Sequence, residues 1–170
     1  MSHEYRLWAM PLVTSVHVLE ERIMDWRTWV KETSGVDFPW SDFSAINGAL
    51  VAGAVVGARV GWRAPVLSLS IPALTVINAA GFHLAPTLRD RRYSPGALTA
   101  TLLYLPIGFW IYDGAKRDGV LTKRVGIGSA ITGAALMALP FALARSRARH
   151  RDEAAVQSTA GAQASRITLR

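Results

Sequence analysis

Long runs without a charged residue constrain the fold of this 170-residue chain more than any other feature. Twenty-five consecutive residues, 64–88, contain no Asp, Glu, Lys or Arg, and the runs 93–112 and 125–144 hold 20 such residues each. A helix that crosses the hydrocarbon core of a bilayer needs about 20 mainly apolar residues. Three runs of this length predict a membrane protein and argue against an ordinary soluble domain.

The distribution of charge supports the same interpretation. Only 18% of the residues are charged, whereas about 25% is usual in soluble domains. The net charge of +7 comes from short basic clusters between the apolar runs, as in membrane proteins whose loops lie near lipid headgroups. We therefore expect no nucleic-acid binding. The absence of cysteine excludes disulfides and thiolate metal sites.

We expect an all-α fold, a polytopic bundle with five spanning helices over approximately residues 5–25, 43–62, 64–86, 95–112 and 125–144. Small residues at four-residue spacing predict close helix packing in the second segment (Ala49, Gly53, Gly57, Gly61) and in the fifth (Gly126, Ala130, Ala134, Ala138). Residues 145–170 lack apolar periodicity and are rich in Arg, Ala, Gln and Ser. This composition predicts a basic, disordered tail at the membrane surface.

The first segment leaves an alternative open. It is apolar from Leu7 to Leu19, apart from a few polar residues, but Glu20, Glu21 and Arg22 follow directly. An amphipathic helix lying in the membrane interface would also fit this pattern. In that case the bundle would have four spans.

His17, Glu20 and Glu21 form the group most suggestive of chemistry. Their spacing of i, i+3 and i+4 places them on one side of a helix. Each ionised residue at membrane depth costs about 2.5–3.5 kcal/mol on insertion scales. A divalent metal would offset that cost, since imidazole and carboxylate are natural ligands of zinc and iron. Proton sharing or ion pairs with a basic loop would also offset it.

A second polar group, Asn78 and His83, lies in the third segment. With one span between them, the first and third helices run parallel, so their C-terminal ends share one leaflet. We expect the rings of His17 and His83 to lie within roughly 10 Å of each other, close enough to share one metal or ligand. Asn78 and Tyr93, the latter in the following Tyr-Ser-Pro-Gly turn, are candidates for substrate binding.

Each of these residues also has a plainer interpretation. His83 would serve as a polar contact between helices, and Asn78 as an interhelical hydrogen-bonding residue. Glu20 and Glu21 would be the solvated end of the first helix. Tyr93 would anchor the chain at the interface.

The string His17-Val18-Leu19-Glu20-Glu21 resembles the motif of the HXXEE family of small bacterial membrane proteins, whose biochemical role is uncharacterised. Asn78, His83 and the Tyr93-x-Pro95-Gly96 turn resemble further polar positions of that family. The resemblance covers approximately Trp8 to Trp110. It implies an integral protein of the cytoplasmic (inner) membrane of a bacterium and names no substrate.

The function we expect is that of a metal-dependent membrane enzyme acting on a lipid-like substrate. Its metal ligands would come from His17, Glu20, Glu21 and His83, and its catalytic acid or base from Glu20 or Glu21. The two glutamates should differ in role, because neighbours on a helix point about 100° apart. The alternatives are a metal-free glutamate acid acting on a polyprenyl chain, or a non-catalytic transporter or lipid-binding subunit. Membrane lipids are partners in all of them.

Overall fold

The structure, a computed structural model, describes the backbone of residues 2–168 and the side chains of residues 2–150. All regular structure in the described part is helical, which confirms the predicted all-α fold. The elements are η1 (Glu4–Trp8), α1 (Ala9–Ile23), α2 (Trp26–Ser34), α3 (Trp40–Val60), η2 (Gly61–Arg63), α4 (Pro65–Ile77), η3 (Asn78–Leu84), α5 (Ala85–Asp90), α6 (Ala97–Thr99), η4 (Ala100–Tyr104), α7 (Leu105–Arg117) and α8 (Lys123–Thr168).

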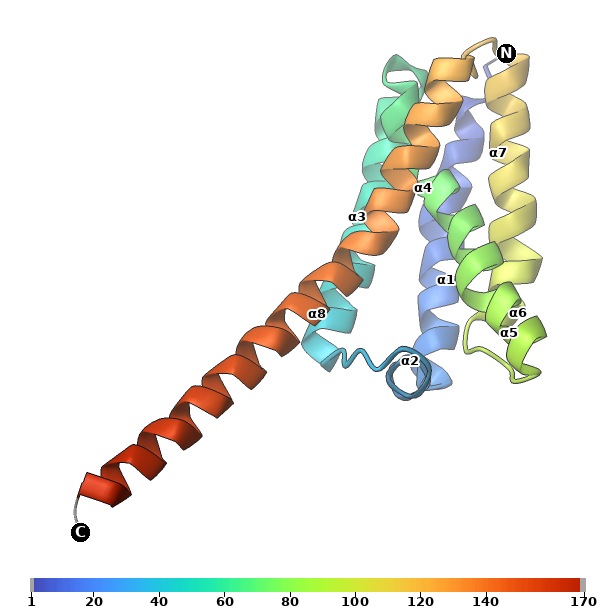
Figure 1. Ribbon diagram of the computed structural model, residues 1–170. Helices are drawn as coiled ribbons and strands as arrows, with labels where there is room; N and C mark the ends of the chain where they lie inside the picture. Colours follow the sequence, from blue (N-terminus) through green and yellow to red (C-terminus); the bar gives the residue numbers. More distant parts are fainter. Residues whose placement is uncertain (1, 169–170) are drawn as a thin grey trace.

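Several elements join end to end, so the described chain makes five helical passes: η1–α1, α3–η2, α4–η3–α5, α6–η4–α7 and α8. Successive passes run in opposite directions along the bundle (Figure 1). The C-terminal ends of the first and third passes and the N-terminal end of the fourth therefore meet at one end of the bundle. This end carries the site described below.

Three helical stretches are long and apolar enough to cross a membrane: Trp40–Arg63, Pro65–Asp90 and Lys123–His150. They correspond to the second, third and fifth predicted spans. α1 lies lengthwise in the bundle beside α3, not across its end (Figure 1). The helix that lies across the end is α2, seen end-on in Figure 1, which the sequence analysis did not predict.

α2 is amphipathic, which explains its position. Trp29 and Val30 are buried against Phe38 and against Phe141 of α8, whereas Lys31 and Glu32 are exposed. A short helix with one apolar side and one charged side is stable where a bundle end meets a polar surrounding.

Close packing of α3 on α4 agrees with the predicted stripe of small residues in the second segment. A Cβ atom on Gly53 would lie 3.3 Å from Ile71 Cδ1, and one on Gly57 would lie 3.4 Å from Ser68 Cα. Side chains larger than glycine would separate these helices. Such close approach favours helix association in lipid, where apolar burial gives little driving force.

The predicted stripe of the fifth segment is wrong, since Ala130, Ala134 and Ala138 are exposed. α8 instead approaches α4 through Gly133, where a Cβ atom would lie 2.7 Å from the backbone nitrogen of Leu74. Small residues are frequent on several faces of this helix, so spacing alone did not identify the contacting face. The backbones of α8 and α4 come closest at Gly133, where only a residue without a side chain fits.

α8 continues past Ala144 as far as Thr168 (Figure 1). The backbone of the segment that we expected to be a disordered tail is therefore helical in this structure. Arg, Ala and Gln are among the strongest helix formers, and they are common in that segment. The segment has no apolar face that could pack on the bundle, but its residue types are compatible with a helix.

The opposite end of the bundle is closed by polar contacts of the N-terminal residues. His3 Nδ1 lies 2.6 Å from a carboxylate oxygen of Asp118, and the indole nitrogen of Trp62 donates to the same carboxylate at 2.7 Å. The hydrogen bond from His3 holds the pKa of the Asp118 carboxyl well below its usual range. This cluster connects the residue before η1 to η2 and to the loop between α7 and α8.

Candidate metal centre

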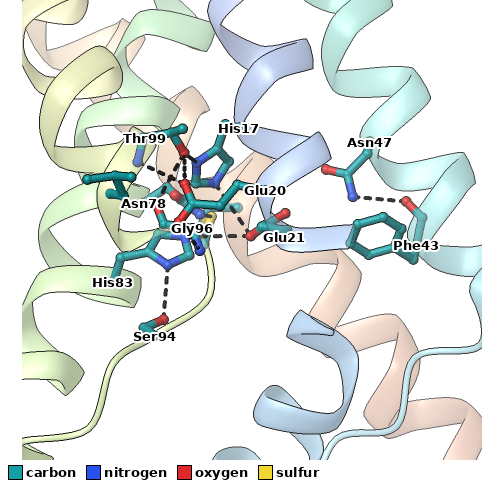
Figure 2. Close-up of polar contacts among 12 residues, drawn as sticks. His17, Glu20, Glu21, Phe43, Asn47, Asn78, His83, Ser94, Gly96 and Thr99 are labelled. Carbon is teal, nitrogen blue, oxygen red and sulfur yellow. Dashed lines mark hydrogen bonds and ion pairs between the residues drawn. The ribbon is translucent and has the colours of Figure 1, made fainter. Parts of the chain in front are cut away.

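The antiparallel passes bring three buried side chains together near one end of the bundle (Figure 2). His17 and Glu21 stand one turn apart on α1 and face the interior together, with 2% and 5% of their surfaces exposed. His83 comes from η3 and is fully buried. His17 and His83 are 66 positions apart in the sequence. They are neighbours because the first and third passes run in the same direction, as predicted.

The geometry of this group is compact. Glu21 Oε1 lies 3.4 Å from His17 Nε2 and 3.6 Å from His83 Nε2. The two imidazole rings are edge to face, with centroids 4.9 Å apart and planes at 80°. The prediction that these rings lie within roughly 10 Å of each other is confirmed. One ligand atom from each of the three residues lies within 4.8 Å of the others.

Both Nε2 atoms are buried and have no hydrogen-bond partner among the described residues. Their distances to Glu21 exceed the 2.7–2.9 Å of a charge-assisted hydrogen bond. They match instead the spacing of ligands around a tetrahedral metal, where bonds of 2.0–2.2 Å put neighbouring ligand atoms roughly 3.3–3.6 Å apart. If these three residues held one metal ion, they would leave a fourth position open, the arrangement of catalytic zinc sites.

Glu20, also predicted as a ligand, is directed elsewhere. Its carboxylate accepts hydrogen bonds from the backbone nitrogens of Gly96 (3.2 Å) and Thr99 (2.9 Å), at the start of the fourth pass. The free backbone N–H groups at a helix N-terminus favour a carboxylate there. The structure therefore brings three of the four predicted ligands together and places Glu20 at a helix end.

Tyr93 completes the surroundings of Glu20. Its hydroxyl donates to Glu20 Oε1 at 2.5 Å and accepts from the backbone nitrogen of Leu98 at 3.2 Å. Burial and the bond to Glu20 raise the pKa of the Tyr93 phenol, so it remains a protonated donor. Its observed partner is thus Glu20, and its predicted role in substrate binding stays a prediction.

Thr99 links Glu20 to His17. The Thr99 hydroxyl lies 2.5 Å from Glu20 Oε2 and 2.8 Å from His17 Nδ1. A carboxylate only accepts, so the single hydroxyl hydrogen goes to Glu20, and Nδ1 of His17 must donate to Thr99. In a neutral imidazole this leaves the lone pair on Nε2, the atom that faces Glu21. Sequence analysis missed Thr99 because one threonine in an apolar run is unremarkable.

The Nδ1 atom of His83 also has a hydroxyl partner. It lies 3.0 Å from the hydroxyl of Ser94, which is fully buried in the loop before α6. Ring nitrogens of metal-binding histidines that do not bind the metal generally have such partners, which orient the ring. Ser94 stands inside the Tyr-Ser-Pro-Gly turn that the sequence analysis singled out, but its own role was not predicted.

Gly96 packs directly on the three ligands. Its φ is +95°, and a Cβ atom there would lie 2.7 Å from His83 Cε1, 2.8 Å from His17 Cε1 and 3.1 Å from Glu21 Cγ. Both the backbone conformation and the lack of space require glycine at this position. The loop thus covers the site with backbone atoms.

Two further polar residues lie on η3 and η4. Asn78 begins η3, the segment that carries His83. Its amide nitrogen has only a distant sulfur partner, Met137 at 3.7 Å, and its Oδ1 is buried without one. Tyr104, which the sequence analysis missed, ends η4 and stacks on His17 with ring centroids 4.2 Å apart. η3 and η4 are both π-helical, a geometry frequent at functional sites.

Thr99→Val is expected to weaken divalent-metal binding by about 10- to 100-fold, the usual cost of removing an outer-shell partner of a ligand. Valine keeps the shape of threonine but cannot accept a hydrogen bond from His17 Nδ1. Thr99→Ser, which retains the hydroxyl, should bind metal almost as tightly as the unaltered chain. Competition with a chromophoric chelator measures the three affinities. Equal affinities for the valine and serine variants would contradict the link through Thr99.

A family model described as a protein of unknown function with HXXEE motif matches residues 8–111. The match includes the whole of α1 and extends through all residues that surround the site. It confirms the resemblance predicted from the sequence. No curated protein and no solved structure matches the chain.

Proposed function

The chain belongs to the HXXEE family, and from the geometry of its site we propose that it is a metal-dependent integral membrane enzyme acting on a lipid-like substrate. One observation carries the proposal: two buried imidazole nitrogens without hydrogen-bond partners lie 3.4 and 3.6 Å from one carboxylate oxygen. His17, Glu21 and His83 would be the ligands of a zinc or iron ion.

A metal accounts for this group better than a shared proton does. A protonated Glu21 has one hydrogen to donate, so the second Nε2 atom could pair with it only as an N–H donor. At 3.4 and 3.6 Å, neither contact has the 2.7–2.9 Å length of a charge-assisted hydrogen bond. A divalent cation accepts the lone pairs of both nitrogens and compensates the charge of the buried carboxylate. This argument favours the metal over the metal-free acid catalyst.

The open fourth position suggests the reaction. A metal-bound water loses its proton near neutral pH and becomes a nucleophile, so hydrolysis of an ester, amide or phosphate bond is the reaction class we propose. Glu20 would not act as the base, because Thr99, Gly96 and Tyr93 engage its carboxylate. Its role would be to position His17 through Thr99.

The lipid-like substrate follows from the proposed placement in a membrane. Three stretches meet the length and apolarity of spanning helices, and we propose that the first and fourth passes span as well. Both carry large apolar side chains on their outer surfaces: Leu12 is 68% exposed on α1, and Leu102 and Phe109 are 61% and 59% exposed on the fourth pass. Large apolar side chains exposed on the outside of the bundle fit lipid better than water. By family resemblance, the membrane would be the inner membrane of a bacterium.

Metal analysis of the full chain, purified in detergent, tests the proposal. We expect about one equivalent of zinc or iron per chain as isolated, or of zinc or cobalt after incubation and removal of excess metal. A chain that binds no divalent metal by either route would overturn the proposal. The metal-free acid catalyst, the transporter and the lipid-binding subunit would then be the remaining candidates.

A further inference from the structure

Buried polar atoms without partners are concentrated at the candidate metal centre. Among the described residues, six buried side-chain nitrogen or oxygen atoms have no hydrogen-bond partner, and four lie on α1, η3 and η4, the segments that form the site: His17 Nε2, His83 Nε2, Asn78 Oδ1 and the Tyr104 hydroxyl. Buried polar atoms are almost always paired in folded proteins, so each exception needs a reason. The proposed metal accounts for the two nitrogens only.

The two remaining atoms have complementary chemistry. The Tyr104 hydroxyl is a donor, and Asn78 Oδ1 only accepts. They come from η4 and η3, the two π-helical segments, which pack against each other. An oxygen or other anionic atom in the open metal position would be an acceptor for the Tyr104 hydroxyl, whose ring stacks on the proposed ligand His17.

Tyr104 is firmly held in this position. It is 1% exposed and stacks on His17, with an angle of 34° between the rings. A neutral phenol is also a suitable donor in an apolar surrounding, because burying it costs far less than burying the cation of Lys or Arg.

We propose that Tyr104 is a catalytic residue whose hydroxyl donates a hydrogen bond to an oxygen or other anionic atom in the open metal position. In hydrolysis this atom would be the metal-bound hydroxide or the oxygen that gains negative charge when the carbonyl or phosphoryl group is attacked. Donors aimed at developing negative charge are among the largest contributions to catalysis. The inference rests on the proposed function and assigns one more residue to its chemistry.

The test uses the full chain in detergent, loaded with Co²⁺, and titrated with azide as an anionic probe while the visible absorption of the metal is followed. Tyr104→Phe keeps the ring that stacks on His17 and removes only the hydroxyl. We expect Co²⁺ affinity to change less than about two-fold and azide affinity to fall about 10- to 100-fold, as for loss of a hydrogen bond to a charged group.

Tyr112→Phe is the matched control. Tyr112 lies on the same pass, but its hydroxyl contacts Ser129 at 3.0 Å, away from the three ligands. Azide affinity should be unchanged in this variant. Equal azide affinity in Tyr104→Phe and the unaltered chain would overturn the role of Tyr104 but leave the metal centre standing, as would loss of Co²⁺ binding in Tyr104→Phe alone. Failure of the unaltered chain to bind Co²⁺ would overturn the proposed function itself.

Discussion

His83→Ala should abolish stoichiometric binding of divalent metal. The substitution removes one of three proposed ligands from a buried site, and no other described His, Cys, Asp or Glu belongs to the group. We expect a loss of affinity on the order of a thousand-fold or more, beyond the 10- to 100-fold of an outer-shell change. Metal analysis and chelator competition on the detergent-purified protein measure it. His17→Ala should behave in the same way.

Glu21→Gln separates charge from shape in the same experiment. Glutamine has nearly the size of glutamate but no negative charge, and we expect it to weaken metal binding strongly while the protein remains folded. His3→Ala is the matched histidine control, because His3 contacts Asp118 at the opposite end of the bundle. It should retain a full equivalent of metal. If all the site variants failed to fold and the unaltered chain held no metal, the group would be a structural polar cluster.

Gly96→Ala should both destabilise the protein and disrupt the metal centre. A non-glycine residue in left-handed conformation costs roughly 1–2 kcal/mol, and overpacking of a filled interior costs about 1–3 kcal/mol more. We therefore expect the free energy of unfolding to fall by about 2–5 kcal/mol. The strain would arise in the loop that covers both histidines and Glu21. We expect a lower midpoint of thermal unfolding in detergent and a large loss of metal affinity.

Gly35→Ala distinguishes backbone strain from crowding. Gly35 has φ of +71°, but nothing lies within 4 Å of the position that its Cβ would occupy. Its substitution should therefore cost only the conformational strain and leave metal affinity unchanged. If Gly96→Ala and Gly35→Ala had the same effect on unfolding and on metal binding, the close packing of Gly96 on the ligands would have no energetic consequence.

The contacts of His17, Glu20 and Glu21 give each fixed residue of the HXXEE motif a structural role. Its histidine and second glutamate, His17 and Glu21, face the interior one helical turn apart and join His83. Its first glutamate, Glu20, faces the start of the fourth pass and engages Thr99. Adjacent glutamates on one helix thus serve different neighbours, as the angle of about 100° between them predicts.

Much of this arrangement could be predicted from the sequence. Charge-free runs indicated the helices, because the bilayer allows so few alternatives. The alternation of passes then placed His17, Glu21 and His83 at one end of the bundle. Both inferences depend on length and order along the chain.

The tertiary structure alone decided which faces meet. Rotation of α1 about its axis determines that Glu21, and not Glu20, joins the histidines, and no local pattern sets that rotation. The same holds for Gly133, the point where α8 approaches α4. It also holds for Thr99 and Tyr104, which share a mainly apolar run with Thr101. These choices depend on side-chain packing between segments far apart in sequence, whereas the helices themselves depend on local composition and hydrogen bonding within each segment.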